Sequence, residues 1–185
     1  VVQPCPDIDG IVVCPATIDL SGAEIELVDV ERREYRLREA LREYVSEHAD
    51  IDIVLIDCPP SLGLVTLNVM VAADEVMIPI QAEYYALEGL SQLWNTVERI
   101  GVDLNPGLRV SGMLLTMADK RTKLSEEVES EVRSHFPDHT FETVIPRSVR
   151  ISEAPSYGQT VVTYDPRNVG AIAYRKAALE LCQRV

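Results

Sequence analysis

The sequence has 185 residues, of which 46% are hydrophobic and only 5% aromatic, so one domain with a mainly aliphatic core is expected. Its net charge of -13 argues against broad binding of nucleic acid, because an acidic surface repels phosphates, but it leaves room for a local basic patch. No apolar run approaches the roughly 20 residues that span a bilayer, and the start at Val1, without Met, suggests a cut or incomplete chain.

The first half alternates short apolar runs with amphipathic stretches. Residues 51–57 (IDIVLID) are nearly all apolar, as expected for a strand covered on both faces. Leu37, Leu41 and Val45 share one face of a predicted helix whose other face carries Arg and Glu. We therefore predict strands at 11–14, 51–57 and 75–80, the last one also buried, and helices at 31–48 and 62–73.

The second half continues this alternation. A helix at 88–100 is followed by a turn at 105–107, where the sequence is Asn-Pro-Gly. We then predict a strand at 110–116, a helix at 125–136 with Ser125 as N-cap, a strand at 141–145 and a closing helix at 168–183. Alternating strands and helices of this length predict an α/β fold with a doubly wound, mostly parallel sheet.

Cysteine and histidine give no sign of a metal site. The four cysteines are scattered without a CxxC pair, and we interpret them as reduced, mostly buried thiols. The histidines are predicted to be solvated at the surface. They are His48, His135 and His139.

Polar residues follow four of the predicted strands, and ligands of open parallel sheets bind at the carboxyl ends of strands. Asp57 closes an apolar strand, and its carboxylate suits Mg²⁺, directly or through water. From the residues alone, an N-cap or an ordinary tight turn around Pro59 and Pro60 explains this segment as well. Gly63 would let the turn approach a phosphate. The other strand ends are at 81–83, 116–119 and 146–147.

Five cations follow two neighbouring strands of this acidic chain and are called the basic patch. A polyanion fits such a cluster, with about one phosphate neutralised per side chain, while solvated loop charge is the alternative interpretation. The basic patch comprises Lys120, Arg121, Lys123, Arg147 and Arg150.

Long strings of the sequence closely resemble the ParA/Soj chromosome and plasmid partition ATPases. They lie at residues 15–27, 51–68, 81–93, 112–128 and 144–175, and the resemblance covers essentially the whole chain. It implies a P-loop NTPase fold of the SIMIBI class with a deviant Walker motif. It also implies a cytoplasmic, nucleoid-associated homodimer that sandwiches ATP and Mg²⁺, binds DNA without sequence preference and hydrolyses ATP when a ParB-type partner stimulates it, without a membrane partner.

The resemblance assigns roles residue by residue. Asp57 resembles the Walker B aspartate that acts on Mg²⁺ through water, and Pro59, Pro60 and Ser61 resemble the segment that senses the γ-phosphate. The residues that match the adenine surroundings are Thr116, Met117, Asp119, Pro146 and Arg147. Within the basic patch, Arg121 and Arg150 match arginines that contact DNA, and we assign Lys120 and Lys123 to the same surface.

One part of the family pattern has no match here. The 185 residues contain no KGGVGKT-type loop and no upstream aspartate for the attacking water. We therefore expect residues 1–185 to be the C-terminal portion of a single ATPase domain that lacks the first strand and the P-loop. We also expect no catalytic residue in this chain, no tight ATP binding, exposed apolar neighbours of the first strand, and marginal stability.

Three other interpretations compete with a partition ATPase. A MinD-like positioning ATPase would end in a basic amphipathic helix, whereas residues 178–185 carry little basic character. An iron–sulfur relative would bridge a cluster with cysteines after sheet strands, but Cys58 stands alone there. A non-catalytic module that binds DNA or a ParB-type partner, without an ATP site, is the third.

Overall fold

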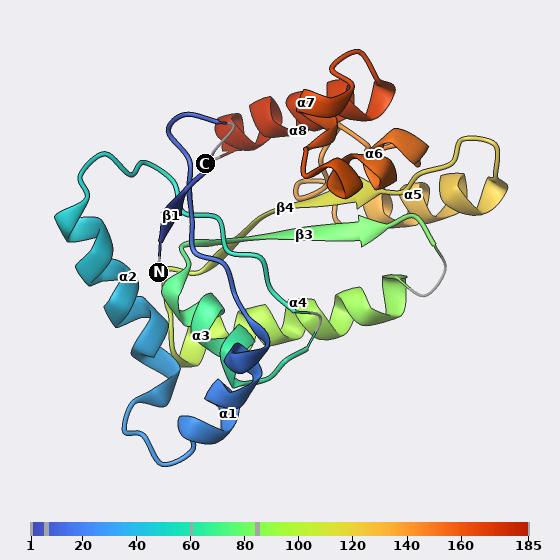
Figure 1. Cartoon of the computed structure of the whole chain (residues 1–185). Coiled ribbons are helices and arrows are strands. Elements are labelled where there is room, and N and C mark those ends of the chain that lie inside the picture. Colours follow the sequence, from blue (N-terminus) through green and yellow to red (C-terminus); the bar gives the residue numbers. More distant parts are fainter. Residues whose placement is uncertain (1, 6–7, 60, 84–85, 185) are drawn as a thin grey trace. The chain divides into compact units, whose positions relative to one another are not determined.

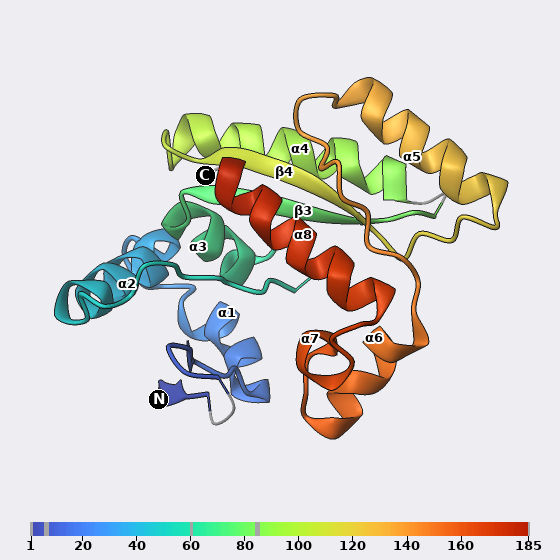
Figure 2. The same cartoon turned by 90° about the horizontal axis from the view of Figure 1, so that it is seen from above.

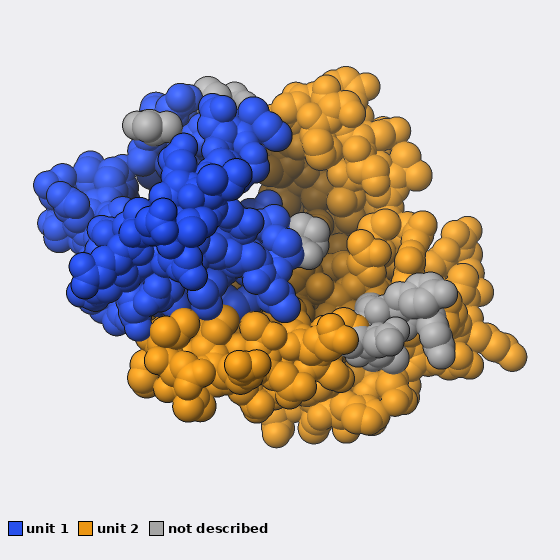
Figure 3. Space-filling model, turned by 90° about the horizontal axis from the view of Figure 1, so that it is seen from below, with its two compact units in different colours: residues 1–72 blue, residues 73–185 orange. Residues whose placement is uncertain are grey.

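The computed structural model describes residues 2–5, 8–59, 61–83 and 86–184, and it gives no account of the side chains of residues 86–88. The chain forms two compact units, Val1–Ala72 (unit 1) and Ala73–Val185 (unit 2), coloured separately in Figure 3. The prediction that the whole chain belongs to one domain stays a prediction.

Unit 1 is built from short elements (Figure 1). Two short strands, β1 (Gln3–Pro4) and β2 (Val12–Val13), pair in antiparallel fashion, so the predicted strand at 11–14 is confirmed at its centre. The predicted helix at 31–48 begins later than expected, because a 3₁₀ turn precedes it. The helical elements are η1 (Ile18–Gly22), α1 (Ala23–Glu26), η2 (Arg33–Tyr35), α2 (Arg36–Glu47) and α3 (Leu64–Ala72).

The buried amide of Asn68 ties α3 to the start of α2. Its Oδ1 accepts from the backbone N–H of Leu37 at 3.2 Å, and its Nδ2 donates to the carbonyls of Arg33 and Leu64 at 2.9 and 3.0 Å. A buried amide is tolerated only when its polar atoms have partners, and here they do. The predicted helix at 62–73 is thereby confirmed and fixed against its neighbour.

The predicted strand at 51–57 is wrong for this structure. Residues 51–59 form neither strand nor helix, and the side chains of Ile53, Val54 and Leu55 are 70%, 47% and 83% exposed. An apolar run becomes a buried parallel strand only when neighbouring strands take up its backbone N–H and C=O groups. Among the described residues no strand pairs with this segment, which explains why it forms no strand and stays mostly exposed.

Unit 2 contains a parallel pair of strands, β3 (Glu75–Gln81) and β4 (Arg109–Thr116), in a register that runs from Glu75↔Arg109 to Gln81↔Thr116. Both strands were predicted, as were the three longest helices of this unit. The helices and 3₁₀ turn are α4 (Ala86–Asp103), α5 (Lys123–His135), α6 (Val149–Glu153), η3 (Ala154–Tyr157), α7 (Val161–Tyr164) and α8 (Val169–Arg184).

Helices of unit 2 lie on both faces of β4 (Figure 2). On one face, Met113 and Leu115 of β4 are fully buried together with Leu90 of α4 and Val128 and Val132 of α5. On the other face the buried cluster joins β4 to α8, and its members are Leu114, Phe141, Ile145, Ala173 and Ala177. Side chains alternate along β4 to supply both layers, as the pleat requires.

Only one face of β3 is buried, although the sequence predicted a fully buried strand. Ile78 and Ile80 are 4% exposed, but Met77 before them is 41% exposed, and Pro79 between them and Gln81 after them are exposed as well. Pro79 also has no backbone N–H to donate, which suits a strand that is not hydrogen-bonded on both sides.

The segment predicted as a strand at 141–145 runs beside β4 without regular strand geometry. Phe141 and Ile145 donate their backbone N–H groups to the carbonyls of Met113 and Leu115 at 2.9 and 2.8 Å. Isolated parallel bridges at Met113↔Thr140 and Ala118↔Pro146 flank these bonds. The prediction therefore placed the segment correctly and was wrong about its regularity.

Smaller predictions were corrected as well. The N-cap of α5 is Thr122, whose side chain accepts from the backbone N–H of Ser125, so Ser125 receives the cap and does not provide it. The cysteines are not buried, since Cys14, Cys58 and Cys182 are exposed and Cys5 is half-buried.

Two of the three histidines pack on aromatic rings. His135 is exposed as predicted, but His48 and His139 are half-buried. His48 stacks on Tyr44 with ring centroids 4.1 Å apart. In unit 2, Trp94 lies 5.1 Å from the ring of His139 and 5.2 Å from Phe136, and its indole N–H donates to Glu98 at 2.9 Å.

Candidate functional site

The carboxyl ends of β3 and β4 form one edge of unit 2. Ala82 donates its backbone N–H to the carbonyl of Thr116 at 2.9 Å, directly after the last strand pair. The loop that contains Pro146 joins the same edge, because Ala118 bridges to Pro146 and accepts from the backbone N–H of Arg147 at 2.9 Å. The fold thus brings together all five residues predicted to surround adenine.

Met117, at the centre of this edge, has a left-handed backbone with φ 55°. A non-glycine residue in this region costs of order 1–3 kcal/mol and persists only where surrounding contacts fix it. The hydrogen bonds of the adjacent Thr116 and Ala118 supply such contacts. Sequence reasoning gave no sign of this conformation, because methionine does not usually adopt it.

Both carboxylate oxygens of Asp119 are engaged with Arg121. The guanidinium donates through Nε to Oδ1 at 2.9 Å and through Nη2 to Oδ2 at 2.7 Å, and the backbone N–H of Arg121 also donates to Oδ1. These hydrogen bonds hold the pKa of the Asp119 carboxyl well below its usual range. A base edge that donates to Asp119 therefore has to compete with Arg121.

Arg147 is paired in a similar way with Glu83, which lies just beyond β3. Its Nη2 donates to the Glu83 carboxylate at 2.8 Å, and both side chains are about half exposed. The sequence had marked residues 81–83 as a strand end without giving Glu83 a role. The pairing of Glu83 with Arg147 could have been predicted from the rule that the ends of neighbouring parallel strands lie at one edge of the sheet.

Arg150 lies on α6 and contacts two carboxylates. It donates to Glu153 at 2.9 Å, lies 3.7 Å from Asp165, and its guanidinium carbon is 5.9 Å from the ring centre of Tyr164. Tyr164 in turn stacks on Tyr157, with centroids 5.0 Å apart. The sequence gave no sign of these partners, because α6, η3 and α7 were not predicted.

The basic patch divides into two groups in the structure. Lys120, Arg121 and Lys123 follow β4, and the charge of Arg147 reaches Asp119 in the same group. Arg150 belongs to the cluster of α6 and α7. The salt bridges among the described residues involve the three arginines of the patch and neither of its lysines.

The remaining predicted contacts lie in unit 1. Asp57, Pro59 and Ser61 are exposed, and Pro60 lies outside the described residues. Local desolvation and the charge of Asp57 raise the pKa of the Cys58 thiol. The carboxylate of Glu24 lies against Gly63, only 2.0 Å from where a Cβ of residue 63 would stand, so the space that we expected near a phosphate holds an acidic side chain.

In unit 1, the predicted site offers Mg²⁺ a single protein ligand, the carboxylate of Asp57. Among the described residues, no group of three or more His, Cys, Asp or Glu could hold a metal ion. Mg²⁺ commonly keeps several waters and takes one or two carboxylates plus phosphate oxygens. The exposed carboxylate of Asp57 is compatible with that role, in which phosphate oxygens and water would supply the other ligands.

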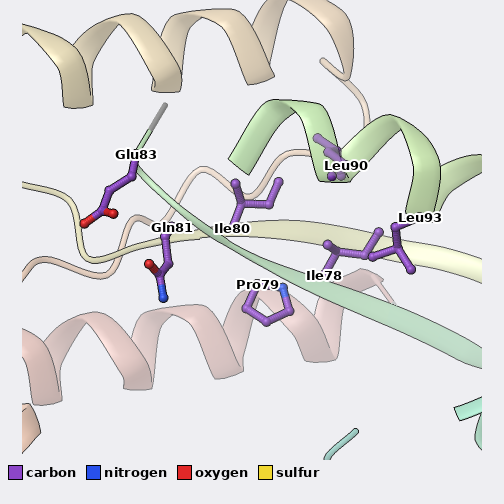
Figure 4. A pocket seen from close by; sticks show the side chains of 8 residues that line it. Ile78, Pro79, Ile80, Gln81, Glu83, Leu90 and Leu93 are labelled. Carbon is purple, nitrogen blue, oxygen red and sulfur yellow. The ribbon is translucent and has the colours of Figure 1, made fainter. Parts of the chain in front are cut away.

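A pocket of about 330 Å³ lies between β3 and α4 (Figure 4). Ile78 and Ile80 point toward Leu90 and Leu93 of α4, while Glu83 lies at the polar end. None of the predicted nucleotide contacts lines it, and its walls belong largely to the apolar core. We therefore assign it no ligand.

Comparison with known proteins identifies the family. A family described as AAA domain matches residues 3–110. The chromosome partitioning protein ParA of Caulobacter vibrioides is 51% identical over 178 residues, which cover 96% of this chain and 66% of that protein. The sporulation initiation inhibitor protein Soj of Bacillus subtilis is 52% identical, over 94% of this chain and 68% of Soj. The chain belongs to the ParA/Soj family.

Solved structures agree with the ParA/Soj assignment. A Mycobacterium smegmatis protein described as cobyrinic acid a,c-diamide synthase, with a bound ATP analogue and magnesium, is 35% identical with a TM-score of 0.80, over 98% of this chain and 65% of that one. The cell division ATPase MinD of Pyrococcus furiosus has a TM-score of 0.65 at 23% identity, over 82% of this chain and 59% of its own, and shows the fold alone.

These comparisons confirm the predicted family and the α/β fold with a parallel sheet of P-loop NTPases. The chain spans about two thirds of the length of the curated ParA/Soj relatives that it matches. No helix among the described residues is long and apolar enough to cross a membrane.

Proposed function

We propose that this chain is part of an ATP-switched partition protein. In the longer protein, ATP and Mg²⁺ join two copies, and the dimer binds DNA without sequence preference and responds to a ParB-type partner. The observation that carries this proposal is the 51–52% identity, across 94–96% of the chain, to proteins named for chromosome partitioning or as Soj.

The geometry of unit 2 supports a nucleotide at the edge formed by β3 and β4. Thr116, Asp119 and Arg147 offer a hydroxyl, a carboxylate and a guanidinium within one group of loops, and Pro146 offers an apolar ring next to them. In unit 1, Asp57 would supply an oxygen toward Mg²⁺. The bound nucleotide would supply the phosphate whose hydrolysis resets the switch, while these side chains bind and orient it.

This chain by itself is expected to bind ATP weakly. Its 185 residues contain no GKGGxGKT-like string, so the backbone amides and lysines that neutralise the phosphates are not supplied by this sequence. Isothermal titration of the purified chain with Mg²⁺–ATP should give no micromolar affinity. Micromolar binding would contradict the proposal that the phosphate site needs further residues, and would favour a site made wholly by this chain.

DNA binding is tested in the longer protein with two arginines of the basic patch. The double variant Arg121→Ala/Arg150→Ala should weaken binding to DNA of random sequence and reduce the salt dependence, because about one phosphate contact is lost per arginine. The matched control is Arg42→Ala/Arg99→Ala, which removes the same charge from exposed positions on α2 and α4. Equal affinity and salt slope for both double variants would remove the DNA role from the patch.

A structural relative that is described as a diamide synthase, with a bound ATP analogue and magnesium, offers a second candidate activity. Its identity of 35% is well below the 51–52% of the partition relatives, so partition is the function we favour. ATP hydrolysis that rises with DNA and a ParB-type protein would support partition. A protein that binds DNA but does not turn over ATP would instead indicate the non-catalytic module.

A further inference from the structure

Each arginine of the basic patch is held by a carboxylate in this structure. Arg121 is bound by Asp119 at two positions, Arg147 by Glu83, and Arg150 by Glu153 with Asp165 nearby. Four carboxylates therefore lie close to the five cations of the basic patch. Their negative charges offset most of the attraction of the patch for a polyanion.

The compensation is strongest at Arg150, where one guanidinium faces two carboxylates. Glu153 lies on the same helix, one turn on, and Asp165 follows α7. The two acidic groups come from different elements, so a rotamer change of one leaves the other in place. The side chains of Arg150, Glu153 and Asp165 are 52%, 41% and 37% exposed, so all three are accessible to an approaching phosphate.

We propose that Glu153 and Asp165 restrain DNA binding at Arg150, so that the phosphate backbone binds there only by displacing them. This inference rests on the proposed DNA binding and adds a restraint to it. The recognised ligand is the phosphate backbone of double-stranded DNA, and the restraint acts on affinity without sequence preference.

A purely supporting role for these carboxylates predicts the opposite effect. If Glu153 served to aim Arg150 at a phosphate, its removal would weaken binding. The local charge argues for restraint, because one positive and two negative groups within 4 Å give the phosphate no net attraction. Exposed ion pairs are individually weak, so a DNA phosphate can compete with them, and the restraint is modest in size.

The test uses the longer protein and a 30-base-pair duplex of random sequence at low salt, where screening is least. Glu153→Gln keeps the size of the side chain and one acceptor oxygen but removes its charge, and Asp165→Asn does the same for the second carboxylate. Each should raise the affinity roughly two- to five-fold, as expected for an exposed ion pair. The matched control is Asp103→Asn, an exposed carboxylate that ends α4 and precedes the start of β4, at the other end of the strands.

A double-mutant cycle separates a specific restraint from general repulsion. In the Arg150→Ala background the gain from Glu153→Gln should disappear, because the carboxylate then has no arginine to release. A gain that persists without Arg150, an equal gain in Asp103→Asn, or a loss of affinity in Glu153→Gln overturns the inference.

The same measurements distinguish this inference from the proposed function. If the unaltered protein does not bind DNA, or if Arg150→Ala leaves its affinity unchanged, the DNA role of this surface fails and the restraint fails with it. If Arg150→Ala weakens binding and Glu153→Gln has no effect, only the restraint is wrong. Thermal melts of each variant should agree closely, which confirms that affinity changes do not come from misfolding.

Discussion

Unit 2 buries Met113, Leu115 and Phe141 completely, whereas in unit 1 Ile25 and Leu55 are 79% and 83% exposed. Both units contain strongly apolar runs, so composition does not explain the difference. In unit 2, helices from the same unit cover both faces of β4. In unit 1, residues 51–57 have no strand beside them among the described residues. Burial thus follows from the neighbours that the chain supplies.

The units also differ in charge. Unit 1 has 14 acidic and 5 basic residues, a net charge of −9, and all five basic residues are arginines within residues 32–42. Unit 2 has 16 acidic and 12 basic residues, a net charge of −4, and holds every lysine of the chain. Attraction for DNA is therefore expected in unit 2, where basic residues are nearly as numerous as acidic residues.

The largest predicted effect compares core residues of the two units. Phe141→Ala should lower the free energy of unfolding by about 3–5 kcal/mol, because it empties a fully buried site between β4 and α8. Leu55→Ala should change it by less than about 0.5 kcal/mol, since that side chain is exposed. Urea unfolding of the purified chain, followed by circular dichroism, measures both. Equal losses would mean that residues 51–57 are buried in solution.

A comparison of two glycines should give the next largest effect. A Cβ at Gly112 would stand 2.3 Å from the ring of Phe141 and 3.1 Å from the carbonyl of His139, so Gly112→Ala should destabilise unit 2 by about 1–3 kcal/mol. Gly63→Ala in unit 1 meets only the end of the Glu24 side chain, which can rotate away. Melting temperatures of both variants check this, with Gly63→Ala/Glu24→Ala as the control for the Glu24 contact.

Helix caps provide a smaller contrast. Thr122→Ala removes the side-chain acceptor at the start of α5 and should cost about 1 kcal/mol, within a range of roughly 0.5–2. Thr17 caps the short η1 in the same manner, but η1 has no buried residue, so Thr17→Ala should have a lesser effect. Replacing each threonine by serine retains the hydroxyl and should restore most of the loss, as chemical denaturation can verify.

The smallest effect concerns the pH dependence of the Asp119–Arg121 pair. The carboxylate pKa is lowered by the hydrogen bonds from Arg121, so the pair is intact above the usual pKa of aspartate and is lost only as the pH falls through the lower folded value. Carboxyl-carbon NMR should therefore show Asp119 still ionised at pH 4. In Arg121→Ala its pKa should move toward the usual value, and an unchanged midpoint would show that the pair does not form in solution.

Much of the fold of unit 2 could be predicted because the local sequence pattern of each long segment indicates its secondary structure. The apolar run at residues 75–80 and the helical segment at 125–136 both contribute residues to a core made within the unit. The strand predicted at 51–57 is wrong for a physical reason. An apolar run forms a buried strand only when other strands lie beside it, and the run itself does not indicate whether the described chain provides them. The short helices α6 and α7 are too brief for periodicity to reveal.

The candidate site was predictable in position and less so in detail. The rule that ligands of open parallel sheets bind at the carboxyl ends of the strands points to Thr116 and Arg147 from the sequence alone. The partners of the arginines were missed, because Glu83 and Asp165 are distant in sequence from the side chains that they hold. Such pairings depend on loop paths, which local patterns do not determine.

The packing of Trp94 against Phe136 and His139 gives unit 2 an optical label of its own, because the chain has one tryptophan. Indole emission thus follows the unfolding of unit 2, and far-ultraviolet dichroism follows the helices of both units. Denaturation curves that coincide for the two signals would reveal cooperative loss of both units. Curves that separate, with the emission change at higher denaturant, would reveal that unit 1 melts first.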